Sequence, residues 1–197
     1  MLALLDNGHG SNTPGKRSPV WKDGSQLLEW EFTRDVARRI KRKLDEIEGI
    51  DGVLLVPEVT DIALTERANR ANKYVKEHGA KNCVFISVHA NAGKGTGWEA
   101  FTTKGTTNSD KFATIFYECA TEKWGKDWAI RKDSSDGDPD KEENYTVLVK
   151  TNCPAVLVEY FFMDTEKDCK YINSEIGRED CADVAVSAII RWANLKR

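Results

Sequence analysis

Short apolar runs alternate with helical patterns along the whole chain, and this alternation constrains the fold more than any other feature. Between the runs, apolar residues recur every fourth position, as in the segment that carries Phe32, Val36, Ile40 and Leu44. Such an order is typical of a sheet layered between helices. The sequence therefore predicts a single α/β domain over residues 1–197. We expect a three-layer sandwich, with a mostly parallel, twisted sheet of about six strands and helices on both faces.

The expected elements follow from these two periodicities. Segments of strand length lie at residues 2–5, 53–56, 84–88, 98–102, 146–149 and 155–158. Further helices are expected around residues 64–75, 112–119 and 182–192. Two polar stretches, NTPGKRSP at residues 12–19 and RKDSSDGDPDKEE at residues 131–143, have the composition of surface loops. The second stretch is either a plain solvated loop or part of a substrate groove.

Charge and hydropathy exclude two classes of partner. The formal net charge of -3 provides no cationic field for nucleic acid or for an anionic membrane. No apolar stretch approaches the length of about 20 residues that spans a bilayer, and the N-terminus lacks the features of a signal peptide. We therefore expect a soluble chain that neither binds nucleic acid nor inserts into membranes and that carries no export signal. The sequence does not indicate an oligomeric state.

Five cysteines are scattered along the chain without a CxxC pair, which argues against a zinc ribbon or a redox motif. They are Cys83, Cys119, Cys153, Cys169 and Cys181. Several fall inside apolar segments, so buried free thiols are the better interpretation than disulfides. This usage favours synthesis in a reducing compartment.

Two of the three histidines follow predicted strands directly. His9 stands in DNGHG after the apolar run MLALL, and His89 stands in SVHAN after VFIS. Open α/β sheets bind ligands at the carboxyl ends of their strands, so both imidazoles are candidate ligand-binding groups. His78 precedes the helix-ending Gly79 and is interpreted as a capping or solvent-exposed residue.

Two glutamates are predicted to point inward, where a carboxylate needs a partner. Glu29 shares the apolar stripe of its helix, whereas the neighbouring Glu31, a rival candidate, falls on the charged face. Glu159 ends the strongly apolar run AVLVE. Two histidines and Glu29 form a donor set that leaves zinc one open position, and Glu159 is then free to act as a base. Each residue alone also fits an ordinary structural role.

The residues around His9 suggest how its side chain is presented. Gly8 and Gly10 are expected to adopt backbone conformations that a side chain would resist, so that the chain turns sharply on both sides of the histidine. Asp6 is either a hydrogen-bond acceptor for a ligand imidazole or a turn-capping residue.

Five motifs in order resemble zinc-dependent N-acetylmuramoyl-L-alanine amidases of the Amidase_3 family, which cut peptidoglycan. They are DNGHG, EWEFTRDVARRI, LTERANRAN, FISVHANA with GWEAF, and PAVLVEYFF. The resemblance runs from Leu2 to about Trp192. It implies that His9, Glu29 and His89 bind one Zn²⁺ per chain and that Glu159 is the catalytic glutamate. It also places Glu99 and Asn144 near the substrate groove.

The chain departs from the family pattern at two points. Ser11 replaces the usual second glycine after the histidine motif. EYFF at residues 159–162 has an aromatic residue at the position where the common pattern, E-x-G-F, has glycine. Neither change affects an implied ligand. Both concern the shape of the groove, so the resemblance does not extend to a preference for a particular stem peptide.

The predicted function is zinc-dependent hydrolysis of the amide that joins the lactyl group of N-acetylmuramic acid to L-alanine in peptidoglycan. The sequence lacks a GxSxG elbow and a P-loop, which argues against a serine nucleophile and against nucleotide binding. Two alternatives stay open, an inactive peptidoglycan-binding module with the same fold and a zinc amidase for another amide. The enzyme would act at the cell wall, either as a phage lysin released from the cytoplasm or as a processed exported enzyme.

Overall fold

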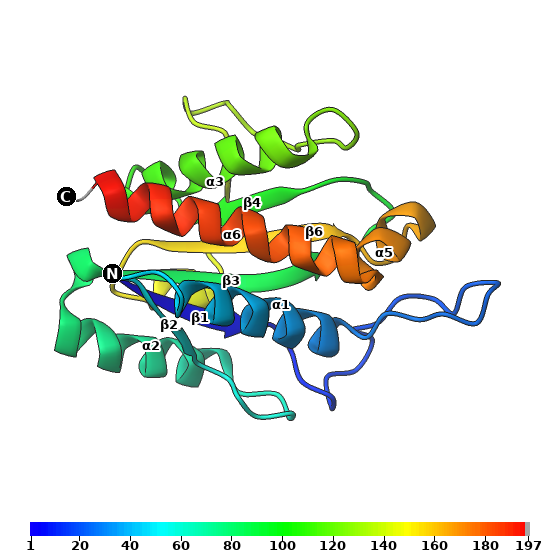
Figure 1. The fold of residues 1–197 in the computed structure, drawn as a ribbon, viewed down its shortest axis with the longest axis horizontal. Coiled ribbons are helices and arrows are strands. Elements are labelled where there is room, and N and C mark those ends of the chain that lie inside the picture. The colour runs from blue at the N-terminus through cyan, green and yellow to red at the C-terminus, as the bar shows by residue number, and fades with distance from the viewer. Residues whose placement is uncertain (196–197) are drawn as a thin grey trace.

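One twisted sheet forms the centre of the molecule (Figure 1), in a computed structural model that describes residues 1–195. Its strands are β1 (Leu2–Asn7), β2 (Asp51–Leu54), β3 (Cys83–Asn91), β4 (Glu99–Thr102), β5 (Lys141–Glu142) and β6 (Ala155–Phe162). Their spatial order is β2-β1-β3-β6-β4-β5. All neighbours pair in parallel except β4 and β6, which are antiparallel. The prediction of a mostly parallel sheet of six strands is confirmed.

Helices cover both faces of the sheet, which confirms the predicted sandwich. One face carries α1 (Glu29–Leu44), α3 (Asn108–Trp124), α5 (Glu166–Asn173) and α6 (Glu175–Leu195) (Figure 1). The other face carries α2 (Leu64–His78) and the short α4 (Thr146–Val149), and a 3₁₀ turn, η1 (Ala80–Asn82), follows α2. Within residues 1–195, no helix combines the length and the apolar character needed to cross a membrane.

Alternation of side chains along β1 divides the core into two layers. Ala3 and Leu5 pack with apolar residues of α1 and α6, whereas Leu2 and Leu4 pack with those of α2 and α4. Successive side chains of a strand point to opposite faces, so a strand that is apolar throughout is buried on both sides. All five cysteines are buried and free, as predicted.

The prediction of a strand at residues 146–149 is wrong. This segment is the helix α4, in which the backbone N–H groups of Leu148 and Val149 both donate to the carbonyl of Tyr145. Four apolar residues fit a strand or a buried helical turn equally well by periodicity, and here Val147 and Leu148 insert into the core beside α2. The sixth strand is instead β5, a charged pair at the sheet edge that carries no apolar signal.

The two polar stretches lie largely at the surface, as predicted, but each contains a buried exception. Ser18 is buried in the first, and in the second Asp140 is 1% exposed. The Asp140 carboxylate accepts a hydrogen bond from Thr102 Oγ1 at 2.6 Å, and its Oδ1 atom has no hydrogen-bond partner among the described residues. Burial, together with the neighbouring Asp138 and Asp110, raises the pKa of Asp140 to about 8.

This raised pKa predicts that stability falls as the pH rises. The unfolded chain releases the Asp140 proton near pH 4, whereas the folded chain keeps it up to about pH 8, so deprotonation increasingly favours unfolding between these values. Asp140→Asn should remove this loss and stabilise the protein at pH 8 by on the order of 2 kcal/mol, or roughly 4–8 °C in Tm. Thermal unfolding at pH 5 and pH 8 measures the difference. Asp136→Asn, at an exposed position of the same stretch, is the matched control, and an equal gain there would contradict the assignment to Asp140.

Candidate metal centre

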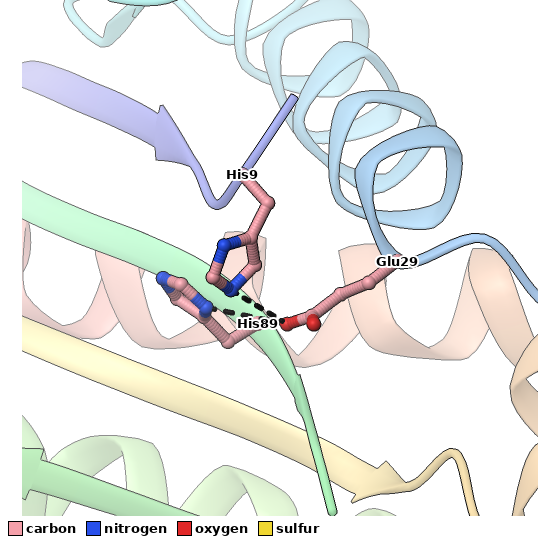
Figure 2. Close-up of side chains that lie close together, drawn as sticks. All are labelled: His9, Glu29 and His89. Atoms are coloured by element: carbon pink, nitrogen blue, oxygen red, sulfur yellow. Dashed lines mark hydrogen bonds and ion pairs between the residues drawn. The ribbon is translucent and has the colours of Figure 1, made fainter. Parts of the chain in front are cut away.

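Three side chains from distant parts of the sequence meet at the carboxyl ends of β1 and β3 (Figure 2). Glu29 Oε1 lies 3.4 Å from Nε2 of His9 and 3.3 Å from Nδ1 of His89. The two imidazole rings are nearly perpendicular, with centroids 5.0 Å apart. One potential ligand atom from each residue lies within 4.8 Å of the other two, so the three groups could hold a metal ion together.

Backbone geometry places these groups. His9 comes two residues after the end of β1, and His89 lies in the neighbouring parallel strand β3, so both reach the same edge of the sheet. Glu29 is the first residue of α1 and turns its side chain inward. Its Oε1 atom accepts a hydrogen bond from the backbone N–H of Ala90 at 3.1 Å, which fixes the carboxylate beside the two histidines.

The donor set fits a zinc ion. Glu29 is 1% exposed, and its second oxygen, Oε2, is buried without a hydrogen-bond partner among the described residues. A buried carboxylate oxygen that lacks a hydrogen-bond donor is costly unless a cation compensates it. Two imidazole nitrogens and one carboxylate oxygen are also ligands that zinc takes in sites with an open position. These properties suit a metal better than they suit a purely structural cluster.

The three groups strongly influence one another's protonation. Burial lowers the pKa of His9 to about 4, which keeps its imidazole neutral and able to bind a metal. Burial alone would lower the pKa of His89, but the Glu29 hydrogen bond and the Glu159 charge outweigh it and raise that pKa. Burial likewise favours the protonated form of Glu29, yet the nearby His89 holds the pKa of this carboxyl below its usual value.

Glu159 lies next to this cluster without joining it. It is the β6 residue that pairs with His89 of β3, and adjacent strands place such partners side by side. Both residues line a groove of about 400 Å³ that also contains His9, Lys16 and Tyr145. The Oε2 atom of Glu159 is buried and has no hydrogen-bond partner among the described residues. Burial raises the pKa of Glu159 to about 7.

The prediction that Gly8 and Gly10 take unusual backbone conformations is wrong. The left-handed residue is His9 itself, with φ of 62°, whereas neither glycine has a positive φ. A Cβ atom on Gly8 would overlap the imidazole of His89, and one on Gly10 would overlap the backbone of Thr60 and Asp61. The glycines are therefore required by close approach, because no side chain fits between these surfaces.

Comparison with known proteins agrees with this geometry. The model of the Amidase_3 family, described as N-acetylmuramoyl-L-alanine amidase, matches residues 3–191. The chain belongs to this family. Among curated Amidase_3 relatives, a sporulation-specific N-acetylmuramoyl-L-alanine amidase of Bacillus subtilis is 28% identical, over 98% of this chain and 69% of the relative. An endolysin of Bacillus phage SPP1 is 25% identical, over 100% of this chain and 67% of that protein.

A solved Amidase_3 structure shows the same fold. The crystal structure of N-acetylmuramoyl-L-alanine amidase from Clostridium difficile 630 superposes with a TM-score of 0.80 at 24% sequence identity. The match covers 98% of this chain and 96% of that chain. The likeness therefore extends over the complete sandwich, including the edge where His9, Glu29 and His89 meet.

Sequence reasoning missed the buried arginine that supports the centre of this Amidase_3 chain. Arg67 of α2 donates to Asp6 at 2.7 Å, to Asp61 at 2.7 Å and to the carbonyl of Asn7 at 2.6 Å. Asp6 is therefore neither of the two things expected of it, because it accepts hydrogen bonds from Arg67 and from Ser87. The sequence signal for this buried residue is that Arg67 lies with the alanines on the inward face of LTERANRAN.

The remaining candidates of the sequence fall into three environments. Glu31 is exposed, away from the cluster, and His78 is exposed at the end of α2, as predicted. Asn144 lines the groove beside Tyr145, and its contact with substrate stays a prediction. Glu99 is buried and is bound by Asn91, Arg131 and Lys141.

One departure from the Amidase_3 pattern has a structural cost. Phe161 occupies the position where the family commonly has glycine, and its φ is 60°. A left-handed conformation costs a residue with a bulky side chain on the order of 1–3 kcal/mol. Phe161 is fully buried against the rings of Trp124, Trp128 and Tyr171, and this packing offsets the strain. Ser11, the other departure, is exposed and donates its backbone N–H to Val59.

Proposed function

We propose that the chain is a zinc-dependent N-acetylmuramoyl-L-alanine amidase that hydrolyses the amide between N-acetylmuramic acid and L-alanine in peptidoglycan. One observation carries the proposal: two imidazoles and a buried carboxylate meet at a single point, with a second, unpaired carboxylate in the same groove. Family membership supplies the reaction, since the relatives are named for this amidase activity. The cluster supplies the groups that such a reaction needs.

We assign His9, Glu29 and His89 as the ligands of one zinc ion. When bound, zinc would polarise the scissile carbonyl and lower the pKa of a water molecule, so that a hydroxide nucleophile is available near neutral pH. The low pKa of His9 keeps this ligand deprotonated at that pH. The hydrogen bond from Ala90 holds the Glu29 carboxylate in place before the metal arrives.

We assign Glu159 as the general base and then the general acid. Its carboxylate takes a proton from the attacking water and afterwards donates it to the alanine nitrogen, which leaves only as a neutral amine. The Oε2 atom of Glu159 has no hydrogen-bond partner among the described residues, so it stays available for this proton. A group with a pKa near 7 can both accept and return a proton at neutral pH.

The groove suits a peptide substrate that lies across the sheet edge. Lys16 and Asp61 lie in segments that precede α1 and α2, whereas Asn144 and Tyr145 precede α4. We propose that the scissile bond lies between these groups, above His89 and Glu159. The site of action would be the cell wall, reached either as a phage lysin released from the cytoplasm or as a processed exported enzyme.

Release of new amino groups from cell walls tests the proposal. Incubation of the protein with purified peptidoglycan should expose N-terminal L-alanine, detected by amine labelling and mass spectrometry. A chelator should stop the release and added zinc should restore it, because the hydroxide nucleophile depends on the ion. Binding of zinc and of cell wall without any release would instead indicate an inactive binding module. Release of a different amine from other amides would indicate a zinc amidase with another substrate.

A further inference from the structure

Two glutamates on neighbouring strands extend from His89 toward the β5 edge of the sheet. His89 of β3 pairs with Glu159 of β6, and Glu159 pairs with Glu99 of β4. Directly paired residues of neighbouring strands point to the same face. Glu99 therefore lies one strand beyond Glu159 on the side of the sheet that carries the catalytic groups.

Two cations more than neutralise Glu99. The carboxylate is 4% exposed and accepts hydrogen bonds from Arg131 Nε at 2.7 Å, Lys141 Nζ at 2.5 Å and Asn91 Nδ2 at 2.5 Å. Burial works against its ionisation, yet Lys141 and Arg131 hold the pKa of Glu99 below its usual value. One negative and two positive charges leave a net positive charge. Glu99 thus acts as an anchor for the two cations, not as a group that faces substrate.

Arg131 is held in a way that leaves one edge of its guanidinium group available. Only Nε is bound to Glu99, and the guanidinium carbon lies 5.1 Å from the ring centroid of Phe162. Among residues 1–195, Nη1 and Nη2 have no hydrogen-bond partner, and the side chain is 39% exposed. These two nitrogens present parallel N–H groups at the spacing of a carboxylate. The arginine is therefore preorganised for an anion.

The distance from β6 to Arg131 corresponds to a few residues of an extended peptide. Its backbone N–H donates to the carbonyl of Trp98, and Ile130 pairs with Trp98 just before β4. Arg131 therefore lies beside the start of β4, on the side away from β6. Two strand spacings of about 4.8 Å separate this position from β6, or roughly 10 Å. An extended peptide advances about 3.3–3.6 Å per residue. A group that binds beside Arg131 would therefore belong to the second or third residue after the scissile bond.

We propose that Arg131, anchored by Glu99 and assisted by Lys141, forms a subsite that binds a free carboxylate of the substrate peptide beyond its L-alanine. This inference rests on the proposed function, because the ligand is the stem peptide of that reaction. Arg131 and Lys141 contact the carboxylate, and Glu99 positions them. The subsite favours peptides whose second residue carries a carboxylate over those in which the same group is a carboxamide.

Two ligands that differ in one group test the subsite. Both are N-acetylmuramoyl-L-alanyl dipeptides, one with a free carboxylate on the second residue and one with a carboxamide there. Their dissociation constants are measured by calorimetry with zinc-loaded Glu159→Gln protein, which prevents turnover, and with the same protein carrying Arg131→Gln, Arg131→Lys or Lys132→Gln. Lys132 is exposed and lies beside α3, so its substitution removes the same charge away from the proposed subsite.

The carboxylate ligand should bind about tenfold more tightly than the carboxamide, as expected for a charge-assisted hydrogen-bonded pair. Arg131→Gln should reduce this preference to about twofold, and Arg131→Lys should retain only a minor part because lysine lacks the fork. Lys132→Gln should leave it unchanged. Equal affinity for the two ligands, or an unchanged preference in Arg131→Gln, would overturn the subsite. If the proposed function were wrong, the result would be different: unmodified protein would hydrolyse neither ligand, but the binding preference would persist.

Discussion

Glu159→Gln should reduce the release of L-alanine from cell walls by about 10³-fold or more while leaving one zinc ion bound per chain. Glutamine has the size of glutamate, but it neither accepts the proton of the attacking water nor delivers one to the alanine nitrogen. Positioned general acid–base groups contribute about 10²–10⁴-fold to rate, and Glu159 is assigned both transfers. The rate is measured with purified walls, and the metal content by atomic spectroscopy on the same preparation.

A control on the same side of the molecule separates chemistry from charge. Glu143 is exposed next to Asn144, so Glu143→Gln removes one negative charge near the groove without touching the cluster. Its activity should stay within about twofold of the unmodified protein. If Glu159→Gln retained more than a tenth of the activity, another group would have to be the base. If it lost its zinc, Glu159 would belong to the ligand set.

The sequence predicts the edge where the site lies because that edge follows from topology. Parallel strands all end on one side of a sheet, so two histidines that each follow a strand are brought to a common edge. His9 and His89 meet for this reason. Helical periodicity does the same for Glu29, because a residue on the apolar stripe of α1 has to face the sheet.

The short elements were beyond sequence reasoning because tertiary contacts decide them. The four residues of α4 and the two of β5 are too few for any periodicity to develop. Lys141 is in a strand because its backbone pairs with Phe101 of β4, and its ammonium group also reaches Glu99 at the sheet edge. The buried Arg67 escaped for a related reason, since its partners Asp6 and Asp61 come from separate parts of the chain.

Gly8 and Gly10 of DNGHG are structurally required, as the sequence indicates, but for a different reason from the one expected. Glycine is expected where φ is positive, but the positive φ belongs to His9, and the glycines make room for neighbouring groups. Arg34 and Arg67 donate to the carbonyl of His9, at 2.9 Å and 3.4 Å, and thereby support its strained conformation. Strain of this kind is typical of functional sites, and only the assembled structure reveals which residue carries it.

Glu29→Gln should weaken zinc binding by more than the 10–100-fold that loss of an outer partner usually costs, whereas Glu31→Gln should bind zinc normally. Glutamine at position 29 still accepts the hydrogen bond from Ala90, so the helix start is preserved while the anionic ligand is lost. Glu31 is exposed two residues further along in the same turn of α1. The two variants therefore carry the same charge change in the same turn.

Thermal unfolding with and without zinc provides a readout that does not depend on activity. A ligand that binds only the folded state at 100 times its Kd adds about 2.7 kcal/mol, or roughly 5–10 °C in a chain of this length. Unmodified protein and Glu31→Gln should both show this shift, and Glu29→Gln should show little of it at the same zinc concentration. The reverse pattern would make Glu31 the ligand. Equal shifts in all three proteins would mean that His9 and His89 hold the ion without a carboxylate from α1, and the buried, unpartnered Oε2 of Glu29 would then need another explanation.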